Sequence, residues 1–311
     1  MRVVSPQEEF QWLLLVGLGV LLSLLPEFFL WRTCLLLVVL VGVPHGALDG
    51  YLLAIEAKKS WKKFSLSIAQ YIFLVVCSLF IWRVFPHLFW AAFFAAAAYH
   101  FGMSDEHPEV LRAISTQALY RTLWILSRGF LLVFAPIACH PQKIAGYISQ
   151  AATPQFATQV THVAPFFCIY AAVIFLWTTF QSWRRASLQT YRWILVKHLV
   201  ALAVFLLLFA VADPLVSFTL YFCCHHSLNH TFRVLGKVQW TKKKGTIGVW
   251  AFTLTVLAIL FFQWVRKYVV DVQLPIGWVS ASFVTIAALT FPHLIVVRDL
   301  HQQLKQRFRT R

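Results

Sequence analysis

Histidines are the residues of this chain best suited to chemistry, and two of them have a spacing that can bind a metal. His226 and His230 are four residues apart, in His226-Ser227-Leu228-Asn229-His230. On a helix, residues with this spacing share one face, with Cβ atoms about 5–6 Å apart, so two imidazoles can bind one ion. The spacing also occurs by chance, so the prediction depends on partners elsewhere in the chain.

Two single histidines supply such partners. His45 and His100 would complete a four-nitrogen site with His226 and His230, and imidazole nitrogen suits iron, zinc, copper or nickel. Asp49 follows His45 by four residues. We expect its carboxylate to bond the other ring nitrogen of His45 and fix the tautomer; the alternative is a helix-end carboxylate that meets solvent.

Four more residues are candidates for the surroundings of this site. Asp105, five residues after His100, either supports that ring or marks the cytoplasmic end of its helix. His293, in Phe291-Pro292-His293, is a fifth ligand, a supporting hydrogen-bond donor or a substrate contact. Tyr99 and Tyr221 would line the same cavity or pack as ordinary aromatic residues.

The other seven of the twelve histidines lack a motif or lie near the ends of apolar runs. We assign them structural or interfacial roles, and His225 is the least secure of them because it adjoins His226. They are His87, His107, His140, His162, His198, His225 and His301.

The elements that must position these residues are membrane-spanning helices. Of the 311 residues 60% are apolar and only 12% are charged, whereas soluble domains have about 25% charged residues. A spanning helix needs about 20 apolar residues, and the sequence predicts ten spans in an all-α membrane bundle. They cover 12–30, 34–55, 66–84, 87–106, 121–140, 163–181, 193–211, 214–235, 246–265 and 276–298.

The distribution of basic residues predicts the orientation of these spans. With both termini cytoplasmic, 20 Lys and Arg lie in cytoplasmic segments and 5 on the opposite side, as the positive-inside rule requires. A short helix is expected around 143–150, in the longest polar connection. No stretch reads as a separate soluble domain, so we predict one integral membrane catalytic domain over 1–311.

The five motif histidines fall at one depth of the predicted bundle. All lie on even-numbered spans, which run in the same direction, and at about 1.5 Å rise per residue they occupy a layer less than about 10 Å thick. Ionisable groups at that depth usually face the bundle interior or a pathway. A purely structural role for all five would not require this coincidence.

Composition also disfavours other classes of function. The chain has a net charge of +16, and its basic residues lie mostly between apolar runs. This pattern is a membrane topology signal and does not indicate a nucleic-acid-binding surface. The six cysteines lack the spacing of a disulfide framework or zinc site. The start of the chain, with Glu8 and Glu9, is a poor match to a cleavable signal peptide.

Taken together, the motifs resemble the Brp/Blh family of membrane β-carotene 15,15′-dioxygenases. The matching segments are in the family's order and are spread over about 250 residues. They are Pro44-His45-Gly46-Ala47-Leu48-Asp49, His100-Phe101-Gly102 with Asp105, His226-Ser227 with His230, and Pro292-His293. The Cys224-His225 pair before His226 departs from the familiar pattern and leaves His225 unassigned.

This resemblance implies Fe(2+) held by His45, His100, His226 and His230, and cleavage of β-carotene by O₂ to two molecules of retinal. It also implies an enzyme in the bacterial cytoplasmic membrane that takes its substrate from membrane lipid and has a possible functional link to a rhodopsin through retinal. We expect an aromatic-lined tunnel, with the metal at its middle, to select the central bond.

Two other classes remain open from the residues alone. A membrane di-iron hydroxylase or desaturase would use several HxxxH boxes near the cytoplasmic face, and this chain has one such box. A metal-ion transporter would also place His and Asp inside the membrane. Such folds commonly contain inverted repeats, and we find no convincing repeat here.

Overall fold

The computed structural model describes residues 6–57, 60–104, 118–186, 189–237, 240–268 and 276–309, and every regular element in these residues is a helix. This confirms the predicted all-α class. The first helices are α1 (Pro6–Ser23), α2 (Glu27–Leu37), η1 (Val38–Gly42), α3 (Val43–Glu56), α4 (Trp61–Val84), α5 (Pro86–Ser104) and α7 (Ala118–Cys139). The later helices are α8 (Pro141–Ala151), α9 (Pro154–Arg185), α10 (Gln189–Val211), α11 (Pro214–Leu220), η2 (Tyr221–Ser227), α12 (Leu228–Lys237), α13 (Trp240–Tyr268) and α14 (Ile276–Arg309).

Proline determines where many of these helices begin. Five of them, α1, α5, α8, α9 and α11, start on a proline, which tolerates the first helical position because that position needs no N–H donor. Side-chain caps mark two starts: the Ser60 hydroxyl accepts from the Lys63 amide, and the Asp213 carboxylate accepts from the Leu215 amide. The helix expected around 143–150 is α8.

Seven helices in the described residues are long and apolar enough to cross a membrane. They match seven of the ten predicted spans; the other three, 12–30, 87–106 and 214–235, do not meet that criterion in their described residues. The segments 87–106 and 214–235 carry histidines, and the second is divided among α11, η2 and α12. The count of ten, the cytoplasmic termini and the single catalytic domain therefore stay predictions.

The boundary between the first two predicted spans is wrong. The sequence pattern continues an apolar run across 12–30, but α1 ends at Ser23 and α2 begins at Glu27. Pro26 lies at this break, and proline has no N–H to continue a helix. The next span consequently starts earlier than predicted and runs without interruption over Glu27–Glu56.

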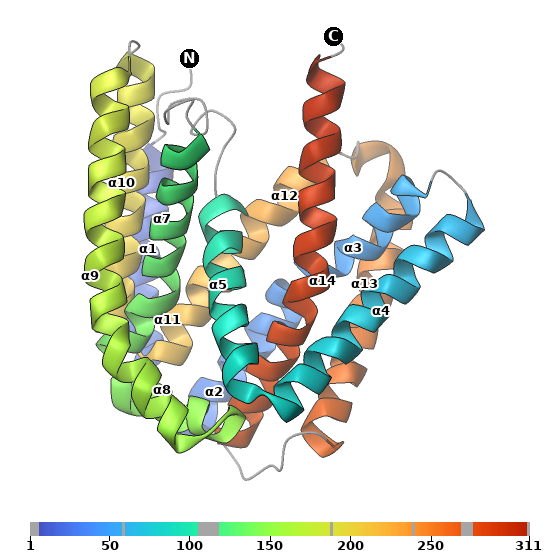
Figure 1. Ribbon diagram of the computed structural model, residues 1–311, viewed down its shortest axis with the longest axis horizontal. Helices are drawn as coiled ribbons and strands as arrows, with labels where there is room; N and C mark the ends of the chain where they lie inside the picture. Colours follow the sequence, from blue (N-terminus) through green and yellow to red (C-terminus); the bar gives the residue numbers. More distant parts are fainter. Residues whose placement is uncertain are drawn as a thin grey trace. The chain divides into compact units, whose positions relative to one another are not determined.

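The chain divides into two compact units. Unit 1 comprises 1–35, 97–146 and 154–226, and unit 2 comprises 36–96, 147–153 and 227–311. In unit 1, α7 packs against α9 and α10, and α1 packs against α10 and α11 (Figure 1). Its core includes Trp124, Phe205, Leu208, Phe209 and Tyr221, all almost fully buried.

Unit 2 has a core of its own. There α3 packs against α13, and α14 packs against α4, α13 and α3. Its buried cluster includes Leu48, Leu52, Val234, Ile247 and Val296. Buried hydrogen bonds add to the apolar packing, because the indole N–H groups of Trp82 and Trp90 both donate to the carbonyl of Ala151, at 2.6 and 3.0 Å.

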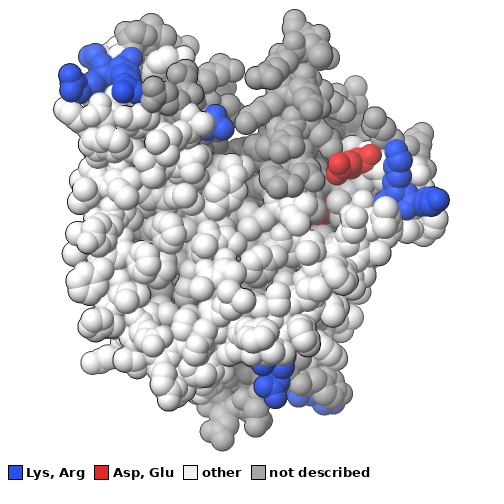
Figure 2. Space-filling view, in the orientation of Figure 1, with Lys and Arg blue, Asp and Glu red and all other residues white. Residues whose placement is uncertain are grey.

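Large apolar side chains also cover the outer surfaces of several helices. Leu66, Phe73 and Phe80 of α4 are more than half exposed, as are Ile169 and Tyr170 of α9. Figure 2 shows one face, on which most described side chains are neither basic nor acidic. Exposed large apolar side chains on helices of this length suit contact with lipid.

Candidate metal centre

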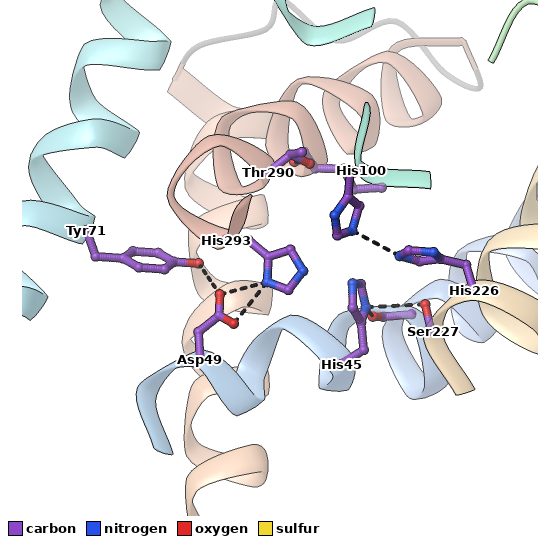
Figure 3. A network of polar contacts seen from close by, with 10 residues as sticks. His45, Asp49, Tyr71, His100, His226, Ser227, Thr290 and His293 are labelled. Carbon is purple, nitrogen blue, oxygen red and sulfur yellow. Dashed lines mark hydrogen bonds and ion pairs between the residues drawn. The ribbon is translucent and has the colours of Figure 1, made fainter. Parts of the chain in front are cut away.

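Unit 1 contains a pair of buried histidines whose ring nitrogens face each other. His100 lies near the end of α5, and His226 lies in η2. Their Nε2 atoms are 3.1 Å apart, and the residues are 4% and 0% exposed (Figure 3). We call these two residues the histidine pair.

This separation is the one that adjacent ligands of a single ion require. Imidazole nitrogens bind zinc at about 2.0–2.1 Å, and similar bonds at a right angle would place two nitrogens about 3.0 Å apart by geometry. The same separation fits an N–H···N hydrogen bond between the rings. The pair can therefore share either one proton or one metal ion.

Two glycines set the position of His100. A Cβ atom at Gly102 would overlap the backbone carbonyl of Ile125, and one at Gly129 would overlap the carbonyl of Ala98. Helices α5 and α7 therefore meet backbone to backbone. Successive residues on a helix are about 100° apart, so His100, two positions from both Ala98 and Gly102, projects away from this contact.

Aromatic rings surround His226. The ring of Phe222 is stacked on it at 5.9 Å between centroids, and Phe101 meets it edge to face at 4.8 Å. Phe101 also contacts Tyr221 at 5.4 Å. Arg128, 1% exposed, donates from Nη1 to the Phe101 carbonyl at 3.2 Å. The histidine pair is thus held by packing, and one hydrogen bond fixes the backbone of Phe101, the residue after His100.

Unit 2 contains three further histidine rings in mutual contact. Ring centroids are 5.7 Å apart for His45 and His230, 5.1 Å for His45 and His293, and 5.5 Å for His230 and His293. All three residues are buried. Ligand nitrogens of His45 and His293 lie within 4.8 Å of one another. We call these residues the histidine trio.

A π-helical turn lies directly before the helix that carries His45. Pro44 has no N–H and its ring crowds the carbonyl four residues earlier, and the turn just before it, η1, is π-helical. The Nδ1 atom of His45 contacts the carbonyl of Gly42 in this turn and lies 3.2 Å from the hydroxyl of Ser227. A proton on Nδ1, donated to the carbonyl, leaves the ring's lone pair on Nε2.

Asp49 supports a different histidine from the one predicted. Both of its carboxylate oxygens lie 2.9 Å from Nδ1 of His293, and Oδ2 also accepts from the Tyr71 hydroxyl at 3.2 Å (Figure 3). The expected bond to His45 is therefore wrong. Four-residue spacing places two side chains on one helix face, but it does not exclude a better partner from another helix.

The other predicted residues lie outside these two groups. Tyr99 is 36% exposed, and Tyr221 is buried among Phe101, Phe205 and Phe209 in the core of unit 1. Asp105 lies outside the described residues. His225 packs on Phe205, with 4.5 Å between ring centroids, which fits the structural role predicted for it.

Three residues that contact the histidines or their immediate neighbours were not predicted from the sequence. Arg128 had a signal, because a charged residue inside an apolar run usually has a function or a specific partner. Ser227 had a weak signal in its position next to His226. Tyr71 had none, since one tyrosine in an apolar helix is indistinguishable from ordinary packing.

The histidines of each unit are of a type that suits a first-row transition metal. His45, His100, His226, His230 and His293 are each 7% exposed or less. Imidazole binds such metals as a neutral ligand and suits iron, zinc, copper and nickel. An ion held by neutral ligands keeps its positive charge, and the carboxylate of Asp49 lies behind one ring.

Two comparisons with known proteins found similarity. The family model described as beta-carotene 15,15′-dioxygenase matches residues 36–301, a range that contains all five of these histidines. The curated β-carotene 15,15′-dioxygenase of uncultured marine bacterium 66A03 is 28% identical over 275 residues, which cover 85% of this chain and 91% of the relative. No solved structure matches the chain.

Proposed function

Because this chain belongs to the β-carotene 15,15′-dioxygenase family and is therefore an oxidoreductase, we propose that it cleaves the central double bond of β-carotene with O₂. The products are two molecules of retinal. The reaction is balanced, since one O₂ supplies both aldehyde oxygens and no external reductant is consumed. Seven long apolar helices agree with an enzyme that works inside a membrane.

The observation that carries the proposal is the histidine pair. Two neutral imidazoles rarely meet at 3.1 Å in an apolar core without a shared ion or proton. We propose that Fe(2+) is bound by His45, His100, His226 and His230, as the family resemblance implies. When bound, iron would supply the activation of O₂ that the reaction needs.

The remaining side chains would exclude water and bind a hydrocarbon. β-Carotene has no charged or hydrogen-bonding groups, so its site needs apolar walls and little else. Phe101 and Phe222 already pack on His226, which keeps polar solvent away from its ring. We propose that the shape of an apolar tunnel, with the metal at its middle, selects the central bond.

The location and partners of the enzyme are part of the proposal. We propose that it resides in the bacterial cytoplasmic membrane, takes β-carotene from membrane lipid, and supplies retinal that a rhodopsin would use. The basic segments 58–63 and 242–244 would face the cytoplasm under the positive-inside rule.

Expression in bacteria that accumulate β-carotene tests the activity. We expect loss of orange colour and appearance of retinal, measured by chromatography of extracted lipid. A dominant eccentric cleavage product with little retinal would contradict selection of the central bond.

Metal content and two single variants separate the proposal from its alternatives. We expect about one iron per purified chain. Two irons per chain would favour a di-iron enzyme instead. Metal uptake by reconstituted vesicles without carotenoid cleavage would favour a transporter. His226→Ala and His230→Ala should each lose iron and activity while the protein still inserts, and full activity in either variant removes that residue from the proposed ligands.

A further inference from the structure

His293 is held in a way that suits a metal ligand. It lies on α14, while the carboxylate that contacts it comes from α3 and the tyrosine behind that carboxylate comes from α4. His293 is 5% exposed and Asp49 is 2% exposed. Three helices of unit 2 thus contribute to one chain of contacts, in which both Asp49 oxygens lie 2.9 Å from Nδ1 of His293 and Tyr71 contacts Asp49 (Figure 3).

The carboxylate decides which nitrogen of His293 carries the proton. An ionised carboxylate only accepts hydrogen bonds, so Nδ1 is the donor. In the neutral ring the lone pair is then on Nε2. A carboxylate bonded to the outer nitrogen of a histidine is the common arrangement behind metal-bound imidazole, where it fixes the tautomer and raises the basicity of the ligand.

Charge balance favours a cation near this group. A carboxylate buried in an apolar interior is costly unless positive charge or several hydrogen bonds compensate it. In the described residues, the hydrogen bonds to Asp49 come from His293 and Tyr71. A metal ion bound on the far side of the His293 ring would supply the missing positive charge through a neutral imidazole.

The neighbours of His293 point to the same ion. Its ring lies 5.1 Å from that of His45 and 5.5 Å from that of His230, and both are ligands in the proposed function. The ring of His293 therefore adds a third imidazole beside these two proposed ligands.

We propose that His293 is a further ligand of the metal, bound through Nε2, and that Asp49 and Tyr71 are the residues that position it. This inference rests on the proposed function, because it concerns the same ion. It extends the four-histidine set and explains why Asp49 contacts His293 and not His45.

Metal binding by the purified full-length protein in detergent tests this inference without reference to activity. The probes are Fe(2+) in competition with a chelator, and Co(2+) as a spectroscopic substitute whose ligand-field bands report the number of ligands. Wild type is compared with His293→Ala, His293→Gln, His293→Gly and Asp49→Asn. His162→Ala is the matched control, because it removes an exposed imidazole from α9.

Loss of a residue that supports a metal ligand weakens metal binding by about 10–100-fold. We expect His293→Ala and His293→Gln to weaken Fe(2+) binding by at least this much. The cobalt bands should change to those of a site with one fewer nitrogen ligand. In His293→Gly, added free imidazole should restore both binding and spectrum. His162→Ala should match wild type in both measurements.

Asp49→Asn distinguishes a metal ligand from a simple buried ion pair. If His293 binds the metal, removal of the carboxylate charge weakens Fe(2+) binding by about 10–100-fold. If His293 only pairs with Asp49, metal affinity in Asp49→Asn stays at the wild-type value.

Wild-type affinity and an unchanged cobalt spectrum in His293→Gln would overturn the inference. Should His293→Ala fail to fold, His293→Gln and Asp49→Asn still decide the question. Wild-type protein that binds no iron and cleaves no β-carotene would instead contradict the proposed function.

Discussion

The histidine pair of unit 1 and the histidine trio of unit 2 are supported by different kinds of interaction. The pair depends on packing: Gly102 and Gly129 let two backbones touch, and the rings of Phe101 and Phe222 enclose His226. In the trio, polar atoms hold two of the rings. A backbone carbonyl and a hydroxyl contact His45, and the carboxylate of Asp49 contacts His293.

This difference separates two tasks that a metal site requires. Packing fixes where an imidazole lies, because close-packed helices cannot shift without overlap. A hydrogen bond to the outer nitrogen fixes which nitrogen holds the lone pair and how basic it is. We therefore expect changes in unit 1 to act through stability and position, and changes around the trio to act through metal affinity.

The largest effect is expected for Gly129→Ala. The added methyl group would overlap the carbonyl of Ala98, so α5 must move away from α7 and carry His100 with it. Overpacking of this kind costs about 1–3 kcal/mol in the free energy of unfolding, and a displacement near 1 Å at a reacting centre costs about 100-fold in rate. Thermal unfolding and retinal production measure the two changes.

Gly146→Ala is the control for this variant. Gly146 is also helical, and nothing lies within 4 Å of an added Cβ, so stability should stay level or rise by up to about 1 kcal/mol. Equal behaviour of the two alanine variants would show that the contact between α5 and α7 does not set the position of His100.

Asp49→Asn should give the opposite combination of effects. We expect Fe(2+) affinity to fall by about 10–100-fold while the unfolding temperature changes little, because the variant keeps the shape of the side chain and removes a buried charge. Chelator competition and thermal unfolding on one preparation test this. A large loss of stability with wild-type metal affinity would remove the distinction between the two groups.

A smaller effect is expected for Phe101→Leu. The variant keeps apolar bulk but removes edge-to-face contacts with His226 and Tyr221, and such contacts contribute about 0.5–1.5 kcal/mol beyond the buried area. The predicted result is a loss of retinal production of about 2- to 10-fold with iron content unchanged. Loss of iron in this variant would mean that packing also controls ligand affinity.

The smallest effect is expected for Ser227→Ala. The hydroxyl of Ser227 contacts Nδ1 of His45, but the carbonyl of Gly42 contacts the same nitrogen and remains in the variant. The net loss should therefore be near the lower limit for a hydrogen bond, about 0.5 kcal/mol, which is about a 2-fold change in Fe(2+) affinity. A change above tenfold would show that the hydroxyl, and not the carbonyl, fixes the tautomer.

The sequence by itself determined the helical membrane class and indicated most of the candidate residues for chemistry. Long apolar runs require lipid or an apolar core whatever the details of packing, and the spacing of His226 and His230 on a helix depends only on local geometry. The motifs around His45, His100 and His293 were sufficient to indicate the family. These properties follow from composition and short-range order.

Only the tertiary structure decided which polar group supports which ring. Asp49 lies four residues from His45 but bonds His293, which is 244 positions away along the chain, and Tyr71 completes that contact from a third helix. The close approach of α5 and α7 at Gly102 and Gly129 is likewise invisible in the sequence. A hydrogen bond forms with the partner that the packed helices bring within about 3 Å, and spacing along one helix carries no information about the others.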